Sequence, residues 1–176
     1  SLSPVTTTEQ IQLQQRAQEI INKIRTLQAE LATITPQLKD FIALGTPTTQ
    51  KLGLGERAGV VSSFTSAFGK APSSEADWQD VIKITNGRWP TQRSDTKEQQ
   101  AEDAFTKIYQ REPERASNAH DDAAVTVMSY GLRPADRNLK SEAAATKSFT
   151  AIYGYAPTTA SDWDAVRAIA YSGAKR

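Results

Sequence analysis

The only histidine of this 176-residue chain lies in the segment Asn-Ala-His-Asp-Asp at residues 118–122. His120, Asp121 and Asp122 are residue types that bind metal ions or transfer protons in acid–base catalysis. One histidine rules out a site with two histidine ligands, and the lack of cysteine rules out thiolate ligands, thiolate nucleophiles and disulfides. Acidic residues just after an asparagine also fit the first turn of a helix, where free N–H groups favour negative charge. We interpret the segment as a helix start.

Other segments that resemble chemical motifs are incomplete. The pairs Glu102/Asp103 and Glu112/Glu114 are typical of solvated helices and loops, and no pair stands out as the two carboxylates of a glycosidase. Gly-Leu-Gly at residues 53–55 lacks the Lys-Ser/Thr that completes a phosphate-binding loop. The sequence therefore predicts no enzyme, no catalytic residue, no metal site and no cofactor.

The charge balance and the hydropathy of the sequence argue against two further functions. Lysine and arginine total 21 against 20 acidic residues, which gives a formal charge of +1 and no field to attract nucleic acid. We find no basic run and no apolar stretch close to 18 residues, so we predict neither a nucleic-acid partner nor a membrane-spanning segment.

Two of the three tryptophans lie at equivalent positions of a sequence segment that occurs twice. Residues 63–87 read SFTSAFGKAPSSEADWQDVIKITNG, and residues 148–173 read SFTAIYGYAPTTASDWDAVRAIAYSG, with a constant offset of 85 from Phe64/Phe149 onward. A third, degenerate copy lies between them and carries three extra residues, with Phe105 at the position of Phe64 and Asp122 at the position of Trp78. The sequence therefore predicts three repeat units, about residues 56–90, 97–134 and 141–173.

Each repeat unit reads as a pair of helices. The first helix has apolar residues at i, i+4 and i+8, and a glycine and a proline end it. The second begins with a short polar side chain and an aspartate three residues later, the spacing of a helix cap. These caps are Ser74/Asp77, Asn118/Asp121 and Thr159/Asp162.

The tryptophan after the cap has two interpretations. We expect it to be the first buried residue of the second helix, although an exposed tryptophan would instead form a platform for a carbohydrate. The expected structural anchors are Phe64, Trp78, Phe105, Phe149 and Trp163. The basic pairs Arg88/Arg93 and Arg133/Arg137 recur where units meet, and we expect them to bind helix carbonyls or carboxylates.

A long helix is predicted before the repeats. Thr6 and Glu9 have capping-box spacing, and Pro36 interrupts the helix about 27 residues later. Apolar residues follow with alternating steps of four and three, which is a heptad seam. The seam consists of Leu13, Ala17, Ile20, Ile24, Leu27, Leu31 and Ile34.

A single stripe of this kind needs a partner, either in the same chain or in another copy. The flanking heptad positions hold Arg16, Lys23 and Glu30 on one side. On the other side they hold Gln14, Ile21 and Gln28. These residues do not pair by charge, so an isolated parallel two-stranded coiled coil is not favoured, and Ile21 widens the stripe towards a bundle.

The predicted organisation has three parts. Residues 1–45 form the heptad helix and a short second helix at about 37–44, which ends at Gly45. Residues 46–55 read as a linker by composition, and residues 56–176 form the repeat domain. The predicted fold class is all-α: a long N-terminal coiled-coil-like helix followed by three helix-pair repeats.

Most of the chain resembles a known group of sequences. The segments at residues 55–90, 130–138 and 153–173, after a Gln/Leu-rich heptad helix, resemble uncharacterised, predicted exported proteins of ultrasmall candidate-phylum bacteria. The resemblance covers about residues 10–173 and implies an extracellular or cell-surface location, with a signal peptide removed. Some relatives carry cysteine near the Ala-Tyr-Gly segment, where this chain has Ala168, Ile169 and Ala170, so no thiol is implied here.

The start of the chain, Ser1-Leu2-Ser3-Pro4, fits either a mature chain after signal removal or a trimmed one. From the repeats, the heptad helix and the resemblance, we expect a secreted structural protein that self-assembles into an extracellular filament or surface layer. Its expected partners are other copies of the chain, through the heptad helix and the repeat surfaces. The alternative is a non-catalytic module that binds cell-wall glycan.

Overall fold

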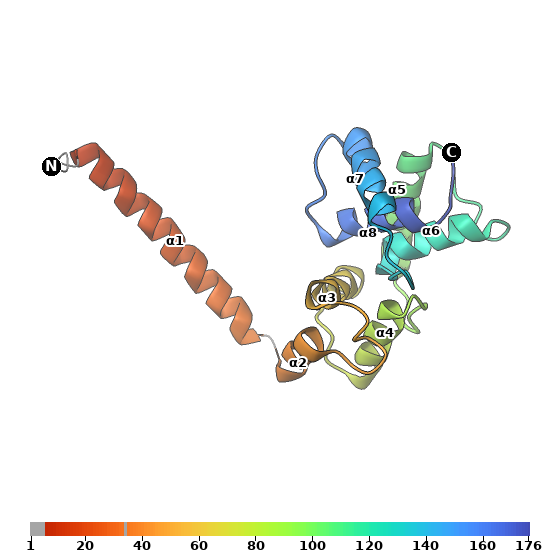
Figure 1. The fold of residues 1–176 in the computed structure, drawn as a ribbon, viewed down its shortest axis with the longest axis horizontal. Helices are drawn as coiled ribbons and strands as arrows, with labels where there is room; N and C mark the ends of the chain where they lie inside the picture. Colours follow the sequence, from red (N-terminus) through yellow and green to blue (C-terminus); the bar gives the residue numbers. More distant parts are fainter. Residues whose placement is uncertain (1–5, 34) are drawn as a thin grey trace. The chain divides into compact units, whose positions relative to one another are not determined.

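The computed structural model describes residues 6–33 and 35–176, and this part of the chain forms eight helices and no strand. The predicted all-α class is confirmed. The helices are α1 (Thr7–Thr33), α2 (Pro36–Leu44), α3 (Leu54–Phe68), α4 (Glu75–Thr85), α5 (Asp95–Tyr109), α6 (Ala119–Tyr130), α7 (Leu139–Tyr153) and α8 (Ala160–Tyr171) (Figure 1). The chain divides into two compact units, residues 1–40 and 41–176.

Helix α1 makes up most of the first unit. The predicted capping box is present, because the Thr6 N–H donates to Glu9 and the Glu9 N–H donates to the Thr6 hydroxyl. The 27-residue helix ends at Thr33, shortly before Pro36. Ile34 of the predicted seam lies outside the described residues. Leu31 lies within the helix.

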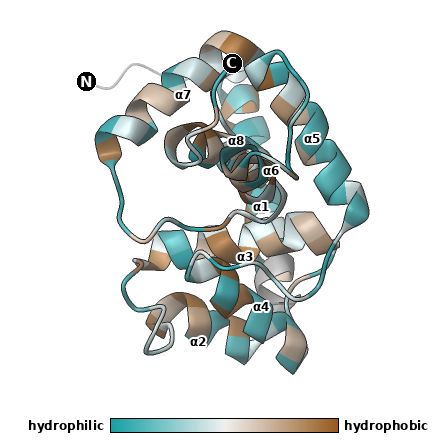
Figure 2. Ribbon diagram, turned by 90° about the vertical axis from the view of Figure 1, so that its right-hand side faces the viewer, coloured by the Kyte–Doolittle hydropathy of each residue, from teal (hydrophilic) through white to brown (hydrophobic). Residues whose placement is uncertain are grey.

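The core of the second unit forms between helices α5 to α8, and α3 packs against α8, α4 and α6. Phe64, Phe105 and Phe149 are fully buried, and Trp78 is 7% exposed. Apolar residues of α5 point into this core, whereas the side of α5 that faces the viewer in Figure 2 is mostly hydrophilic. Burial of a one-sided apolar stripe, rather than intrinsic propensity, is therefore what stabilises these short helices.

The predicted starts of α4, α6 and α8 are confirmed. Ser74 and Thr159 each form a complete capping box with the aspartate three residues on. Asn118 accepts hydrogen bonds from the N–H groups of His120 and Asp121. Each cap satisfies backbone donors that the first turn of a helix would otherwise leave free.

The junction before α5 has a recurring polar arrangement. Arg93 pairs with Glu98 at 2.6 Å, and the Tyr130 hydroxyl donates to the same carboxylate at 2.6 Å. Burial opposes ionisation of Glu98, but the Arg93 guanidinium and the Tyr130 hydroxyl hold the pKa of Glu98 below its ordinary value.

The junction before α7 repeats this arrangement. Arg137 pairs with Glu142 at 2.7 Å, and the Tyr171 hydroxyl donates to Glu142 at 2.6 Å. The expectation that the recurring arginines bind carboxylates is therefore confirmed for Arg93 and Arg137.

Residues 46–55 are not a loose linker, and the boundary between the units falls earlier, between Asp40 and Phe41. Thr49 is fully buried and Leu52 is 8% exposed. The reason is Arg57, a buried residue of α3, which donates to the carbonyls of Ile42, Ala43 and Leu52. Composition alone indicated a linker because these contacts join residues that are distant in sequence.

Candidate functional sites

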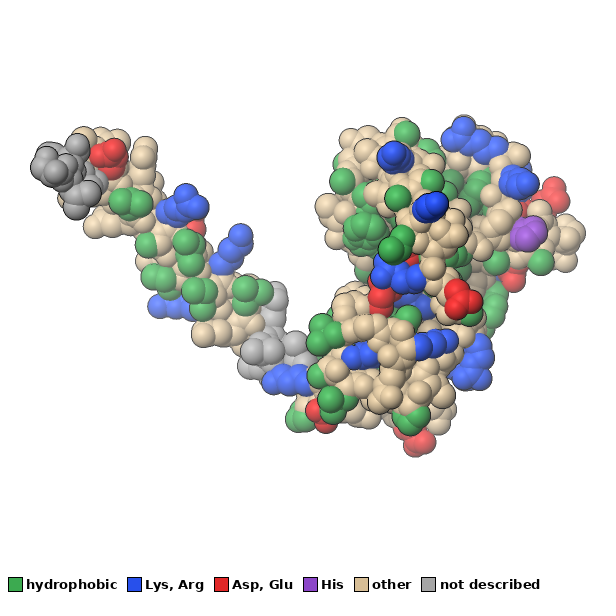
Figure 3. Space-filling model, viewed as in Figure 1, with side chains coloured by type: hydrophobic (Ala, Val, Ile, Leu, Met, Phe, Trp, Pro, Cys, Tyr) green, Lys and Arg blue, Asp and Glu red, His purple; other side chains and the backbone are tan. Residues whose placement is uncertain are grey.

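The apolar face of α1 is exposed. We define the α1 seam as the predicted heptad residues Leu13, Ala17, Ile20, Ile24 and Leu27, whose side chains the structure describes. Leu13 and Leu27 are each 61% exposed, and Ile20 and Ile24 are about half exposed. The side of α1 visible in Figure 3 carries several hydrophobic side chains. Exposed apolar surface of this extent, arranged in one row, is typical of a surface that binds a partner.

The prediction that Trp163 is a buried anchor is wrong. Trp163 is 42% exposed, whereas Trp78, at the same position of the repeated sequence, is buried. Phe41 of α2 packs against Trp78, with ring centroids 5.4 Å apart. Within the described residues, no aromatic ring or cation stacks on the Trp163 ring.

Trp163 borders a hollow of about 350 Å³ between the start of α3, the start of α7 and α8. The volume lies in the range of small-molecule sites. We call it the Trp163 hollow; its walls are Gly55, Glu56, Gly59, Arg137, Glu142, Trp163, Val166 and Arg167. An aromatic face beside charged hydrogen-bonding groups is an arrangement suited to a ligand with an apolar face and polar edges.

A buried arginine lies next to the wall of this hollow. Arg133 is 2% exposed, and its Nε atom lies 3.0 Å from Glu56 Oε2. Its Nη2 atom has no hydrogen-bond partner among the described residues and packs against Gly59, so close that a Cβ atom at Gly59 would lie 2.7 Å away. Burial, and then the neighbouring Arg167, lowers the pKa of Arg133 to about 10, so the group stays charged at neutral pH.

The carboxylate of Asp164 provides negative charge beside Arg133 and Arg167. It is fully buried, accepts from Ser63 at 3.0 Å and pairs with Arg167 at 2.9 Å. Burial raises the pKa of Asp164, and the charges of Arg167 and Arg133 oppose that rise. The network joins α3, α8 and the loop before α7, so it fixes the walls of the Trp163 hollow.

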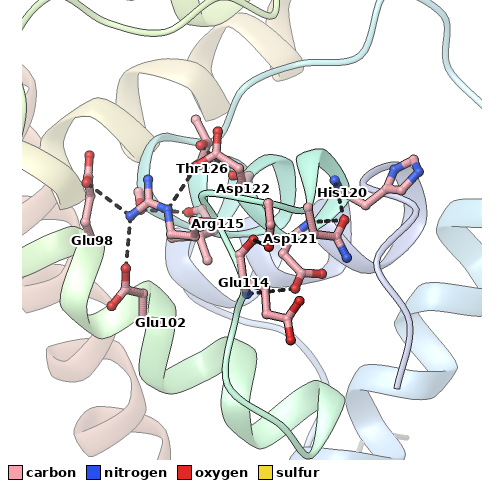
Figure 4. A network of polar contacts seen from close by, with 12 residues as sticks. Glu98, Glu102, Glu114, Arg115, His120, Asp121, Asp122 and Thr126 are labelled. Atoms are coloured by element: carbon pink, nitrogen blue, oxygen red, sulfur yellow. Dashed lines mark hydrogen bonds and ion pairs between the residues drawn. The ribbon is translucent and has the colours of Figure 1, made fainter.

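The segment around His120 is part of a network of ion pairs (Figure 4). Asp121 is fully buried and accepts two hydrogen bonds from Arg111, at 2.6 and 2.7 Å. Asp122 pairs with Arg115 at 3.0 Å, and His120 Nδ1 lies 2.9 Å from the Ser172 carbonyl oxygen. The three residues therefore do not converge on a common point.

Two further observations concern possible ligands and membranes. In residues 6–33 and 35–176, no cluster of three histidine or acidic side chains has the geometry to hold a metal ion. None of the helices described in this part of the chain combines the length and the apolar character needed to cross a bilayer.

A polar cluster that the sequence did not reveal joins helices α3, α5 and α8. Lys97 Nζ lies 2.7 Å from Ser161 Oγ and 2.9 Å from Ser66 Oγ, and the two hydroxyl oxygens are 3.2 Å apart. Lys97 is 6% exposed, whereas both serines are exposed. We call this the Lys97 cluster. Its members are 31 and 64 residues apart in sequence, so no local motif indicates it.

The Lys97 cluster opens into a second hollow of about 200 Å³. Lys97, Gln100, Ser161 and Asp162 provide polar groups there, and most of the wall is apolar, from Ala101, Ala104, Met128, Phe149, Tyr153 and Ala165. Burial lowers the pKa of Lys97, and the charge of Asp164 opposes that shift. A lysine with a lowered pKa beside a hydroxyl is a recognised indicator of a functional site.

Comparison of the chain with protein-family models, with curated proteins and with solved structures found no match.

Proposed function

We propose that the protein is a structural subunit that self-assembles through α1. The observation that supports this most is the α1 seam, because about half or more of the area of its large side chains is open to water. Each fully buried leucine or isoleucine gains about 1.5–3 kcal/mol relative to an exposed one. A 27-residue helix with one apolar stripe is marginally stable alone, so association would stabilise the helix as well as cover the stripe.

The residues of the α1 seam and its flanks are suited to association with other copies of the same chain. In a parallel bundle, the side bearing Arg16 and Lys23 faces the side bearing Gln14 and Ile21 of the next copy, so like charges do not meet. An antiparallel pair centred on Lys23 would place Lys23 opposite Lys23 but also Arg16 opposite Glu30 at both ends, so both orientations are compatible with the flanking charges. Isoleucine at both core positions, as at Ile20 and Ile24, favours three or four strands over two.

Sedimentation equilibrium of the full chain over a range of concentrations tests this proposal. We expect a mass of at least three or four times 19.2 kDa at high concentration, and ordered particles or filaments in negative-stain images. Replacing two seam residues, Ile20→Lys together with Ile24→Lys, should keep the protein monomeric, because a buried unpaired ammonium is very unfavourable.

A matched control is available on the same helix. Gln18 and Asn22 are exposed, lie on the opposite side and have the same spacing. Gln18→Lys with Asn22→Lys should assemble like the wild type. A wild-type protein that stays monomeric at every concentration, or a control that dissociates as the seam variant does, would show that the proposal is wrong.

The repeat domain and the location complete the proposal. We propose that residues 56–90, 97–134 and 141–173 are three copies of one helix pair, which provide further contacts between subunits. Support comes from the equal lengths of α3, α5 and α7, at 15 residues each, and from the shared caps of α4, α6 and α8. The resemblance to exported proteins supports a place outside the cell, in a filament or surface layer.

A second candidate function is binding of cell-wall glycan at the Trp163 hollow. The exposed ring of Trp163 favours it, because a sugar ring can pack on an indole while Arg137, Glu142 and Arg167 bind its hydroxyl groups. Calorimetric titration with soluble peptidoglycan fragments would measure binding. Trp163→Ala should abolish it, and Tyr155→Ala, an exposed aromatic residue that does not line the hollow, should leave it unchanged. Equal affinity in both variants would exclude this site.

A further inference from the structure

The Lys97 cluster occurs once in the molecule, although the sequence around it is repeated. In the alignment of the repeat units, Lys97 corresponds to Glu56 and Ser141. Ser161 corresponds to Ala76 and His120, and Ser66 corresponds to Lys107 and Ala151. Repetition of a building block therefore does not account for the cluster.

We propose that the Lys97 cluster hydrolyses esters of small carboxylic acids, with Ser161 as nucleophile and Lys97 as general base. Ser161 rather than Ser66 is assigned this role because it is nearer to Lys97 and lines the 200 Å³ hollow. A serine hydroxyl and a lysine within hydrogen-bonding distance form one of the known nucleophile–base pairs. Ser66 contacts both groups and is a positioning residue.

The reaction balances with water as the only co-reactant. Ser161 Oγ attacks the carbonyl carbon of the ester, and its proton moves to Lys97 Nζ. When the C–O bond to the alcohol breaks, that proton passes to the departing oxygen, which leaves an acyl-serine. Water then attacks the acyl carbon and gives a proton to Lys97; Ser161 regains this proton, and the carboxylic acid is released.

The start of α8 provides stabilisation for the negative oxygen that forms during the attack. Ser161 is the second residue of α8, after the cap at Thr159. The N–H groups of Ala160 and Ser161 precede the first intrahelical hydrogen bond, so no helix carbonyl accepts from them. Such N–H groups, together with the positive end of the helix dipole, stabilise an oxyanion.

The hollow limits the size of the acyl group. An apolar cavity of about 150 Å³ holds one benzene molecule, so about 200 Å³ accommodates an acyl chain of a few carbons. Its apolar wall, with Met128 and Phe149, favours a hydrocarbon chain over a charged group. p-Nitrophenyl butyrate is therefore a suitable probe.

Charged groups around Lys97 determine the expected pH dependence. Asp164 on α8 favours the ammonium form, and Asp162 lies at the hollow but accepts from Thr158 and Thr159. Tyr153 of α7 also lines the hollow, and burial raises the pKa of its hydroxyl group. The nearest group on α3 is the neutral hydroxyl of Ser66. Lys97 accepts a proton only when it is neutral, so the rate should rise with pH, with a midpoint below the ordinary lysine value of about 10.4.

The test uses the full-length protein with p-nitrophenyl butyrate and with a fluorophosphonate, which modifies nucleophilic serines. We expect turnover with the pH profile above and modification of Ser161, located by peptide mass spectrometry. Ser161→Ala should abolish both, and Lys97→Met should slow both by about 100-fold or more. Ser148→Ala and Lys147→Met change exposed residues elsewhere and should have no effect.

Circular dichroism establishes that each variant is folded. The pH profile of the wild-type protein tests the role of Lys97 without any substitution. The proposal fails if the wild-type protein turns over the ester no faster than Ser161→Ala, or if the fluorophosphonate modifies many exposed serines. It also fails if Lys97→Met does not change the rate. Because Ile20→Lys with Ile24→Lys leaves this cluster intact, activity in that monomeric variant separates the proposal from the proposed assembly.

Discussion

Trp78 and Trp163 follow equivalent helix caps but differ in what covers them. Phe41 lies against Trp78, whereas the Trp163 ring is partly open to water. Trp78→Ala should lower the free energy of unfolding by about 3–5 kcal/mol, and Trp163→Ala by less than about 1 kcal/mol. Urea unfolding of the two variants measures this. Acrylamide should quench the fluorescence of Trp163 but hardly that of Trp78, and equal quenching would contradict the difference in burial.

Asp121 should make stability depend on pH. Its two hydrogen bonds from Arg111 hold the pKa of Asp121 below its ordinary value, even though burial opposes this. A lowered folded-state pKa stabilises the protein fully above about pH 4, the unfolded value, and the contribution is lost as pH falls through the folded value. Asp121→Asn should therefore cost about 2 kcal/mol at pH 7 and progressively less below pH 4.

Urea unfolding at pH 7, 4 and 3 provides the measurement for Asp121→Asn. Asp103→Asn is the control, because Asp103 is exposed on α5 and should change stability by less than about 0.5 kcal/mol at each pH. If Asp121→Asn lowers the free energy of unfolding by the same amount at pH 7 and pH 3, the ion pair between Asp121 and Arg111 does not cause the pH dependence.

At the level of elements, helix α3 contains two glycines in different surroundings. A Cβ atom at Gly59 would lie 2.7 Å from Arg133 Nη2, whereas one at Gly55 would have no atom within 4 Å. Either change to alanine raises helix propensity by up to about 1 kcal/mol. Gly59→Ala should nevertheless destabilise the protein by about 1–3 kcal/mol, because Arg133 is buried and has little room to move.

Gly55→Ala is the matched control and should be neutral or stabilising. Thermal unfolding followed by circular dichroism compares the two variants. If both melt at the same temperature, Arg133 moves freely and the wall of the Trp163 hollow is not fixed by it.

Local sequence patterns predicted the elements but not the contacts between them. Ser74, Asn118 and Thr159 signalled helix starts, because a cap involves residues only three apart. The exposure of Trp163 could not be predicted, because it depends on whether another element covers the ring, as α2 covers Trp78. Lys97 was missed for the same reason: its serine partners come from two other helices.

For the whole molecule, the two units should differ in local stability. The core of residues 41–176 includes fully buried side chains from α3 to α8, whereas every α1 side chain that the structure describes is exposed. Isolated helices are marginal in water even when their sequences favour helix formation. Amide hydrogen exchange should therefore be fast in α1 of the monomer and slow at buried positions such as Phe64 and Val81.

Association should change this pattern most strongly in α1. At a concentration where the protein assembles, amide exchange in residues 13–27 should slow by about 100-fold, because opening the helix then requires loss of the partner contacts. Ile20→Lys with Ile24→Lys should show fast exchange at every concentration. Slow exchange in α1 of the wild-type monomer would contradict the proposal, because it would mean that the seam packs within its own chain. Mass-spectrometric exchange at two concentrations therefore separates the two arrangements that the heptad pattern leaves open.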